Sequence, residues 1–123
     1  MKDLTLYPAL IFYNGEKFLD QEILTYVESI FPQYKAEDIS HKKLTKGEIE
    51  QLSLHLHLSI WEIINKDSAY YRMFAEHIEE MSPEEIIDLI CRHPDLLKSP
   101  IIITQQRSFI AKFPREILEL ALI

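Results

Sequence analysis

The sequence predicts an α/β fold with a four-stranded mixed sheet and helices on both faces of that sheet. Strand-like runs at Ala9–Tyr13 and 34–39 flank an amphipathic segment, as in a parallel strand–helix–strand unit with a right-handed crossover. Residues 101–111 show a strand, a tight turn and a second strand, which is the pattern of an antiparallel hairpin. Capped helix starts lie between these two parts, so we expect a helical insertion at about 45–97.

The N-terminal elements follow from simple patterns. Ala9–Tyr13 is a continuous apolar run rich in β-formers, and Asn14-Gly15 then turns the chain. Apolar residues recur at three- and four-residue spacings over 16–31, which predicts an amphipathic helix that Pro32 ends. Residues 34–39 are a weaker strand.

Helix caps organise the middle of the chain. Thr45 and Glu48 form a capping-box signature, and a second one at 59–62 predicts a new helix start. Residues 52–58 alternate with period two like a strand, but the preceding cap favours helix. Ser82 followed by Pro83 is the strongest helix start, because it joins an N-cap to proline at the first helical position.

The C-terminal part closes the predicted sheet. Residues 101–104 are a buried strand, 105–107 a turn and 108–111 the second strand of the hairpin. We expect a terminal helix over 114–122 with Ile117, Leu118 and Leu122 facing inward.

Composition bounds the class of protein. The chain has 123 residues, which predicts one domain over 1–123, and its formal net charge is −7. An acidic balance disfavours nucleic acid and an anionic membrane surface as partners. The longest uncharged stretch, 4–15, is too short to span a membrane, and no signal peptide is visible. A lone Cys91 excludes an internal disulfide, and we expect a cytoplasmic location.

Residues 82–103 carry a resemblance to a known family. A capped helix ends at His93-Pro94, two apolar residues follow, and Ser99-Pro100 precedes a strand. This run resembles the arsenate reductase (ArsC) family of thioredoxin-fold proteins, which also includes Spx-type regulators. The resemblance implies a thioredoxin-like fold in the order β-α-β, helical insertion, β-β-α, and a cis peptide bond before Pro100.

The same resemblance indicates which residue of this chain occupies the position of the family's nucleophilic cysteine. The family pattern Asn-Pro-x-Cys corresponds here to Asn14, Gly15, Glu16 and Lys17, so lysine stands where the family has its cysteine. A cysteine at a helix N-terminus is activated because free N–H groups and the helix dipole favour the thiolate. Lysine cannot replace that chemistry.

Three arginine positions of the family also differ. The resemblance implies oxyanion-binding arginines at positions that read Asn65, Ser99 and Lys112 here. Arginine suits that task because its planar fork binds oxyanions through two hydrogen bonds at once. These residues together predict a member without redox catalysis, a pseudoenzyme.

Cys91, two of the histidines and a group of aromatic residues each allow a functional and a structural interpretation. Cys91 lies at the end of a predicted helix, where the dipole opposes thiolate, so we expect an inert, partly buried thiol. His55 and His57 stand two residues apart and do not converge on a helix, so no metal site is predicted. Tyr70, Tyr71, Met73 and Phe74 are either an exposed contact patch or a cover for the helical layer.

We therefore expect a cytoplasmic protein that acts by binding a protein or, less favourably, a small anion, without a cofactor. The expected surface comprises Asn14, Gly15, Lys17, Ser99 and Pro100. Lys17 would assist an anion at the helix N-terminus. One alternative is a glutaredoxin-coupled arsenate or disulfide reductase that uses Cys91. Another is an Spx-like regulator that acts through RNA polymerase.

Overall fold

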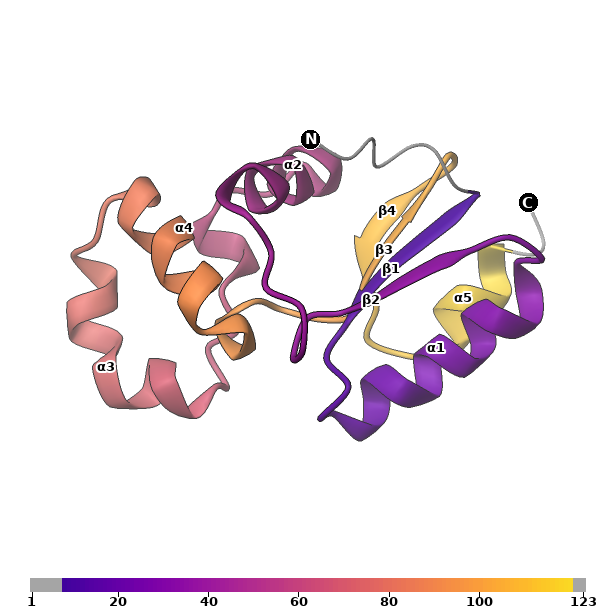
Figure 1. Cartoon of the computed structure of the whole chain (residues 1–123), viewed down its shortest axis with the longest axis horizontal. Helices are drawn as coiled ribbons and strands as arrows, with labels where there is room; N and C mark the ends of the chain where they lie inside the picture. The colour runs from indigo at the N-terminus through magenta and orange to yellow at the C-terminus, as the bar shows by residue number, and fades with distance from the viewer. Residues whose placement is uncertain (1–7, 121–123) are drawn as a thin grey trace. The chain divides into compact units, whose positions relative to one another are not determined.

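The computed structural model describes residues 8–120 of the chain. Its elements run in the order expected for an α/β fold with a helical stretch in the middle (Figure 1). The strands are β1 (Ala9–Tyr13), β2 (Lys35–Asp38), β3 (Ile101–Thr104) and β4 (Ser108–Ile110). The helices are α1 (Phe18–Ile30), α2 (Lys46–Leu56), α3 (Ala69–Glu79), α4 (Pro83–Arg92) and α5 (Arg115–Leu120), with 3₁₀ turns η1 (Trp61–Ile63) and η2 (Pro94–Leu96).

The chain forms two compact units. The sheet unit takes the segments before and after the middle of the chain, and the helical unit takes Lys43–Lys98. The sheet has the order β2-β1-β3-β4, with β1 parallel to β2 and antiparallel to β3, and with β4 antiparallel to β3. This confirms the four-stranded mixed sheet, its parallel first pair and its terminal hairpin.

One face of the sheet packs against α1 and α5 (Figure 1). Ile23 and Val27 of α1 and Ile117 of α5 are fully buried there against Ile11 and Ile102. The strand residues that alternate with these are buried as well, namely Leu10, Phe12, Ile101 and Ile103. Burial on both sides explains why the two central strands read as continuous apolar runs.

The helical unit is built on α2, which packs against α4. The Thr45 and Ser82 capping boxes both form. In each, the side chain of the N-cap residue accepts from the backbone N–H of the N3 residue, and the side chain of the N3 glutamate accepts from the backbone N–H of the N-cap residue. Leu52 and Leu56 of α2 are buried and Leu54 is exposed, which is the pattern of a helix and not of a strand. Ile64 and Leu97 form an isolated antiparallel bridge between the loops that follow η1 and η2.

Two details differ from the expectations. The second capping signature at 59–62 starts only the short turn η1, because the backbone becomes extended at Ile64, where it pairs with Leu97. Leu118 is 48% exposed, so its expected inward position is wrong; Ile117 and Leu120 are the buried residues of α5. The expected inward position of Leu122 lies outside the described residues.

No helix in the described part of the chain combines the length and apolarity that crossing a membrane requires.

Candidate functional site

One end of the sheet gathers most of the expected site residues. Phe12 pairs with Ile101 in β3, which in turn pairs with Ile110 in β4. The segments just beyond these residues therefore emerge at the same end: the turn of residues 14–17 after β1, Ser99-Pro100 before β3, and Lys112 after β4. The Ala111 N–H donates to the Pro100 carbonyl at 3.0 Å, which fixes the last two segments to each other.

The turn of residues 14–17 is built around Asn14. The Asn14 side chain is buried, and its Oδ1 accepts from the Glu16 N–H at 2.9 Å. Its backbone carbonyl accepts from the Lys17 N–H at 3.0 Å. These contacts close an Asx turn that leads into α1, a conformation that asparagine favours because its side chain hydrogen-bonds the backbone two residues on.

Two carboxylates of the protein bind the remaining N–H groups of the turn. Asp20 in the first turn of α1 is 1% exposed, and its Oδ2 accepts from the Asn14 N–H at 2.8 Å. Asp38 at the end of β2 accepts from the Gly15 N–H at 2.9 Å. Asn14, Gly15 and Glu16 thus donate their backbone hydrogens to internal acceptors. An added anion would have to displace these carboxylates and would meet their negative charge.

Asp38 is held by further contacts. Its Oδ1 also accepts from the Ser40 N–H at 3.0 Å and from the Ser40 Oγ at 2.6 Å. Burial raises the pKa of Asp38, but the hydrogen bonds from the Ser40 side chain and from the Gly15 and Ser40 backbones outweigh it, so the pKa lies below its ordinary value. Asp38 is therefore a carboxylate at neutral pH.

Lys17 takes the N-cap position of α1. Its φ of −102° and ψ of 127° are extended, and its side chain makes no capping hydrogen bond. The next residues are apolar and open to solvent, with Phe18 83% exposed and Leu19 40% exposed. The start of α1 thus presents a lysine and, next to it, an exposed aromatic ring.

Ser99 and Lys112 differ in how their polar groups are used. The Ser99-Pro100 peptide bond is cis, as the resemblance implied. The Ser99 Oγ is buried, and it has no hydrogen-bond partner in the described part of the chain. The Lys112 N–H donates to Glu116 Oε1 at 2.6 Å, in a cap at the start of α5, and its side chain is exposed.

Asn65 lies in the helical unit and its side chain is engaged locally. Its Nδ2 donates to the Asp95 carbonyl at 3.2 Å, and its Oδ1 accepts from the Asp67 N–H at 3.1 Å. Its backbone N–H donates to the Leu96 carbonyl at 2.7 Å. Asparagine therefore ties the loop after η1 to η2, which is a structural use of this position.

Cys91 sits near the end of α4 and is half-buried. Burial, and then the charge of Asp88, raise the pKa of the Cys91 thiol above its ordinary value. Asp88 itself pairs with Arg92 at 3.2 Å and with Lys46 at 3.5 Å. The thiol is protonated at neutral pH. Within residues 8–120, no group of three His, Cys, Asp or Glu side chains is placed to hold a metal ion.

The sequence patterns did not point to Asp20 and Asp38, whose carboxylates accept hydrogen bonds from the turn. A weak signal exists for Asp20, because acidic residues favour the first turn of a helix. The pairing of Asp38 with Gly15 joins residues 23 positions apart, so it depends on the parallel register of β1 and β2.

Comparison with known proteins assigns the family. A profile described as the ArsC family matches residues 21–120. The chain belongs to the ArsC family. The structure of an arsenate reductase from Vibrio cholerae superposes on this ArsC-family chain with a TM-score of 0.78 and 17% sequence identity, covering 90% of this chain and 95% of that one. At this identity the likeness shows the thioredoxin-like fold alone.

Curated relatives of this ArsC-family chain carry a different name. A protein named global transcriptional regulator Spx 2 from Oceanobacillus iheyensis is 30% identical over 74 residues, which is 60% of this chain and 55% of the regulator. Global transcriptional regulator Spx from Streptococcus pyogenes is 28% identical over the same shares of the two chains. The match thus spans about half the length of these curated relatives.

Proposed function

We propose that this ArsC-family chain does not reduce an oxyanion and acts by binding another protein. The observation that carries the proposal is the turn of residues 14–17, where Lys17 stands at the helix start and where Asp20 and Asp38 accept from the N–H groups of Asn14 and Gly15. The resemblance implies that a reductase of this family needs a thiolate at that position and arginines that bind its oxyanion, at positions that read Asn65, Ser99 and Lys112 here. Neither requirement is met by these residues.

Cys91 does not supply the missing thiolate in this proposal. Its thiol is half-buried and its raised pKa keeps it protonated at neutral pH. The thiolate is the nucleophile in disulfide and oxyanion chemistry, so a protonated thiol reacts slowly. A reductase that uses Cys91 is the alternative against which the proposal is tested.

A protein partner fits the turn better than a small anion. The carboxylates of Asp20 and Asp38 repel an anion, whereas the exposed Phe18 ring offers apolar area that a protein can cover. Of the expected surface residues, Asn14 and Pro100 are buried, so we centre this binding surface on Lys17 and the exposed Phe18 and Leu19, with Gly15 and Ser99 at its edge. We propose a cytoplasmic setting for it.

The decisive experiment is arsenate reduction coupled to glutathione and glutaredoxin. It compares the wild-type chain with Cys91→Ser and uses an active arsenate reductase as the positive control. We expect no turnover above background in either form. Turnover that disappears in Cys91→Ser would overturn the proposal and establish the thiol-dependent alternative. Turnover that persists in Cys91→Ser would require a mechanism without a thiol and would equally overturn it.

A second candidate is a regulatory role in transcription, which the curated Spx relatives favour. The Cys-x-x-Cys switch that the Spx resemblance implies is absent from this sequence, so the role would not depend on that switch. Binding to purified RNA polymerase, measured by biolayer interferometry, tests it. Saturable binding lost in Phe18→Ser and kept in Leu54→Ser, another exposed apolar residue, would support the role. Absence of binding to RNA polymerase would exclude this regulatory role.

A further inference from the structure

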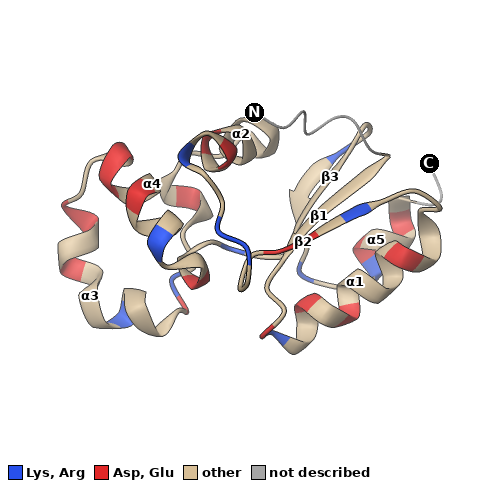
Figure 2. Cartoon of the chain, in the orientation of Figure 1, with Lys and Arg blue, Asp and Glu red and all other residues tan. Residues whose placement is uncertain are grey.

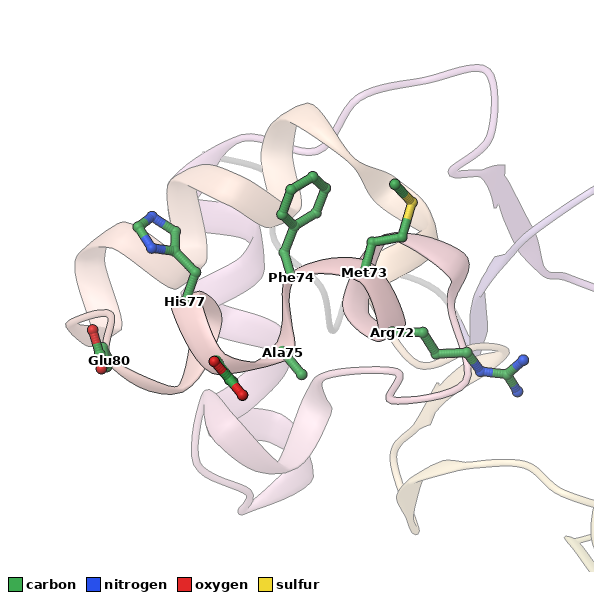
Figure 3. A pocket seen from close by; sticks show the side chains of 7 residues that line it. Arg72, Met73, Phe74, Ala75, His77 and Glu80 are labelled. Atoms are coloured by element: carbon green, nitrogen blue, oxygen red, sulfur yellow. The ribbon is translucent and has the colours of Figure 1, made fainter.

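Helix α3 is bent in the middle and has a hollow along its surface. Phe74 has φ −122° and ψ 23°, which is outside the helical range, so the helix kinks there. A hollow of about 530 Å³ follows the kink and is lined by residues 72–77 and Glu80. That volume lies within the range of about 300–1,000 Å³ that is typical of binding pockets. Figure 3 shows Met73, Phe74 and His77 projecting on one side of the helix and Ala75 on the other.

The kink leaves Phe74 exposed at a position that a regular helix would have turned inward. Tyr71 and Ile78 form the buried stripe of α3, and residue 74 stands three positions after Tyr71, where a regular helix would continue that stripe. Phe74 is instead 43% exposed and Met73 is 75% exposed. The bend is braced from inside, because the Tyr71 hydroxyl donates to Glu79 Oε1 at 3.1 Å across it.

Phe74 has only one aromatic neighbour at close range on its own helix. Its ring centroid lies 4.8 Å from that of Tyr70, which in turn stacks on His93 at 4.1 Å. The Tyr70 ring is therefore fixed, and it supports one side of Phe74 while the other remains open to solvent. Met73 adds a flexible, polarisable side chain that adapts to varied apolar partners.

Acidic residues border this apolar surface. Glu76 and Glu80 line the hollow, Glu79 stands between them in the sequence, and Glu84 and Glu85 follow within five positions of Glu80; all five are exposed. Figure 2 shows these charges on α3 and at the start of α4. Arg72, the cation of the hollow, lies 4.0 Å from Asp67 in an ion pair. A second copy of this acidic chain would be repelled from such a border.

We propose that the hollow on α3 is a docking surface for a basic amphipathic helix of a partner protein. The apolar face of that helix would contact Met73 and Phe74, and its lysines or arginines would pair with Glu76 and Glu80. The inference goes beyond the function proposed above, because it assigns a second surface, in the helical unit, and the chemistry of the partner that it would bind.

The test uses a synthetic helical peptide with leucines along one face and lysines along the other, titrated calorimetrically into the full chain. We expect saturable binding that weakens at least about tenfold in Met73→Ser/Phe74→Ser, since two apolar contacts are lost. Leu54→Ser is the control, because Leu54 is an apolar residue about as exposed (72%) as Met73 (75%) and lies on α2. Its affinity should equal that of the wild type.

Charge variants test the other half of the proposal. Glu76→Lys/Glu80→Lys should weaken the binding of the peptide by about threefold to tenfold, whereas Glu50→Lys on α2 should change the affinity much less. Equal loss in test and control variants, absence of binding, or tighter binding of a glutamate version of the peptide would overturn the proposal. So would concentration-dependent self-association lost in Met73→Ser, which would assign the surface to a second copy. None of these results depends on the arsenate assay, so each proposal can fail separately.

Discussion

Gly15 and Asp38 are packed so closely that any side chain at position 15 would force Asp38 to move. The Gly15 N–H donates to Asp38 Oδ1 at 2.9 Å. A Cβ added at Gly15 would lie 2.9 Å from Asp38 Cγ and closer still to Oδ2. Glycine is needed here for space and not for an unusual backbone angle, because no described glycine has a positive φ. The carboxylate therefore determines which residue follows Asn14.

Gly15→Ala should destabilise the protein by about 1–3 kcal/mol, because Asp38 must move away and lose its hydrogen bonds from the turn and from Ser40. In an Asp38→Ala background the same change should be neutral or stabilising by up to about 1 kcal/mol, since alanine restricts the unfolded chain. Urea unfolding of the four proteins in this cycle measures the difference.

Gly47→Ala is the matched control for that cycle. Gly47 lies in the first turn of α2, where alanine is favoured over glycine by about 0.5–1 kcal/mol. We expect stabilisation with or without Asp38. A destabilisation by Gly15→Ala that persists without Asp38 would show that the clash is not with this carboxylate.

The contribution of Asp38 to stability should depend on pH in the acid range. Its pKa in the folded protein is below the ordinary 3.8. The stabilisation is therefore complete above about pH 4 and is lost as the pH falls through the lower folded-state pKa. Wild type should exceed Asp38→Asn in unfolding free energy at pH 7, and the gap should narrow below pH 4. A gap that is constant from pH 7 to pH 2 would contradict the assignment.

Most of the fold could be predicted from sequence because its signals are local. The Thr45 and Ser82 caps depend on residues three positions apart, and β1 and β3 are apolar runs that central strands require. The signature at 59–62 failed because Ile64 pairs with Leu97, a contact that local sequence does not contain. Helix α3 was not anticipated as an element, although Ser68 caps it by accepting from the Tyr71 N–H.

The candidate site was less predictable for the same physical reason. The match of Lys17 to the family's cysteine position stays a prediction, and the structure places Lys17 at the start of α1. That Asp20 and Asp38 bind the turn could not be found, since each contact joins residues that only the fold brings together. Acidic residues normally face solvent, so no pattern marked these two as internal acceptors.

The end of α2 offers a test of backbone strain. His57 has φ 55° and ψ 38°, a left-handed conformation that glycine adopts without cost. The His57 N–H donates to the Leu54 carbonyl and the Leu58 N–H to the Ser53 carbonyl, which completes a Schellman motif. His57→Gly should stabilise the protein by about 1 kcal/mol because it relieves the left-handed side-chain clash.

His55→Gly is the control for that substitution. His55 lies within α2, where glycine costs up to about 1 kcal/mol in helix propensity, so the two changes should have opposite signs. Thermal unfolding followed by circular dichroism measures both. Destabilisation by both variants would show that the His57 side chain contributes more than its backbone strain costs.

Cys91 should react slowly with iodoacetamide at neutral pH. It is the only cysteine, so mass spectrometry follows its alkylation without interference. Burial and the charge of Asp88 raise the pKa of the Cys91 thiol, so Cys91 should be alkylated more slowly than glutathione at pH 7. As the pH rises, the alkylation rate of Cys91 should continue to increase at pH values where the rate of glutathione has already levelled off.

Asp88→Asn should accelerate the alkylation of Cys91 at pH 8, because removing the carboxylate lowers the thiol pKa while Lys46 remains nearby. Glu84→Gln, at the opposite end of α4, is the control and should leave the rate unchanged. An alkylation rate that is already at its plateau at pH 7 would mean a stable thiolate in the folded chain. That outcome would remove the main physical objection to a reductase built on Cys91, because the nucleophile would then be present without any contribution from the turn at Lys17.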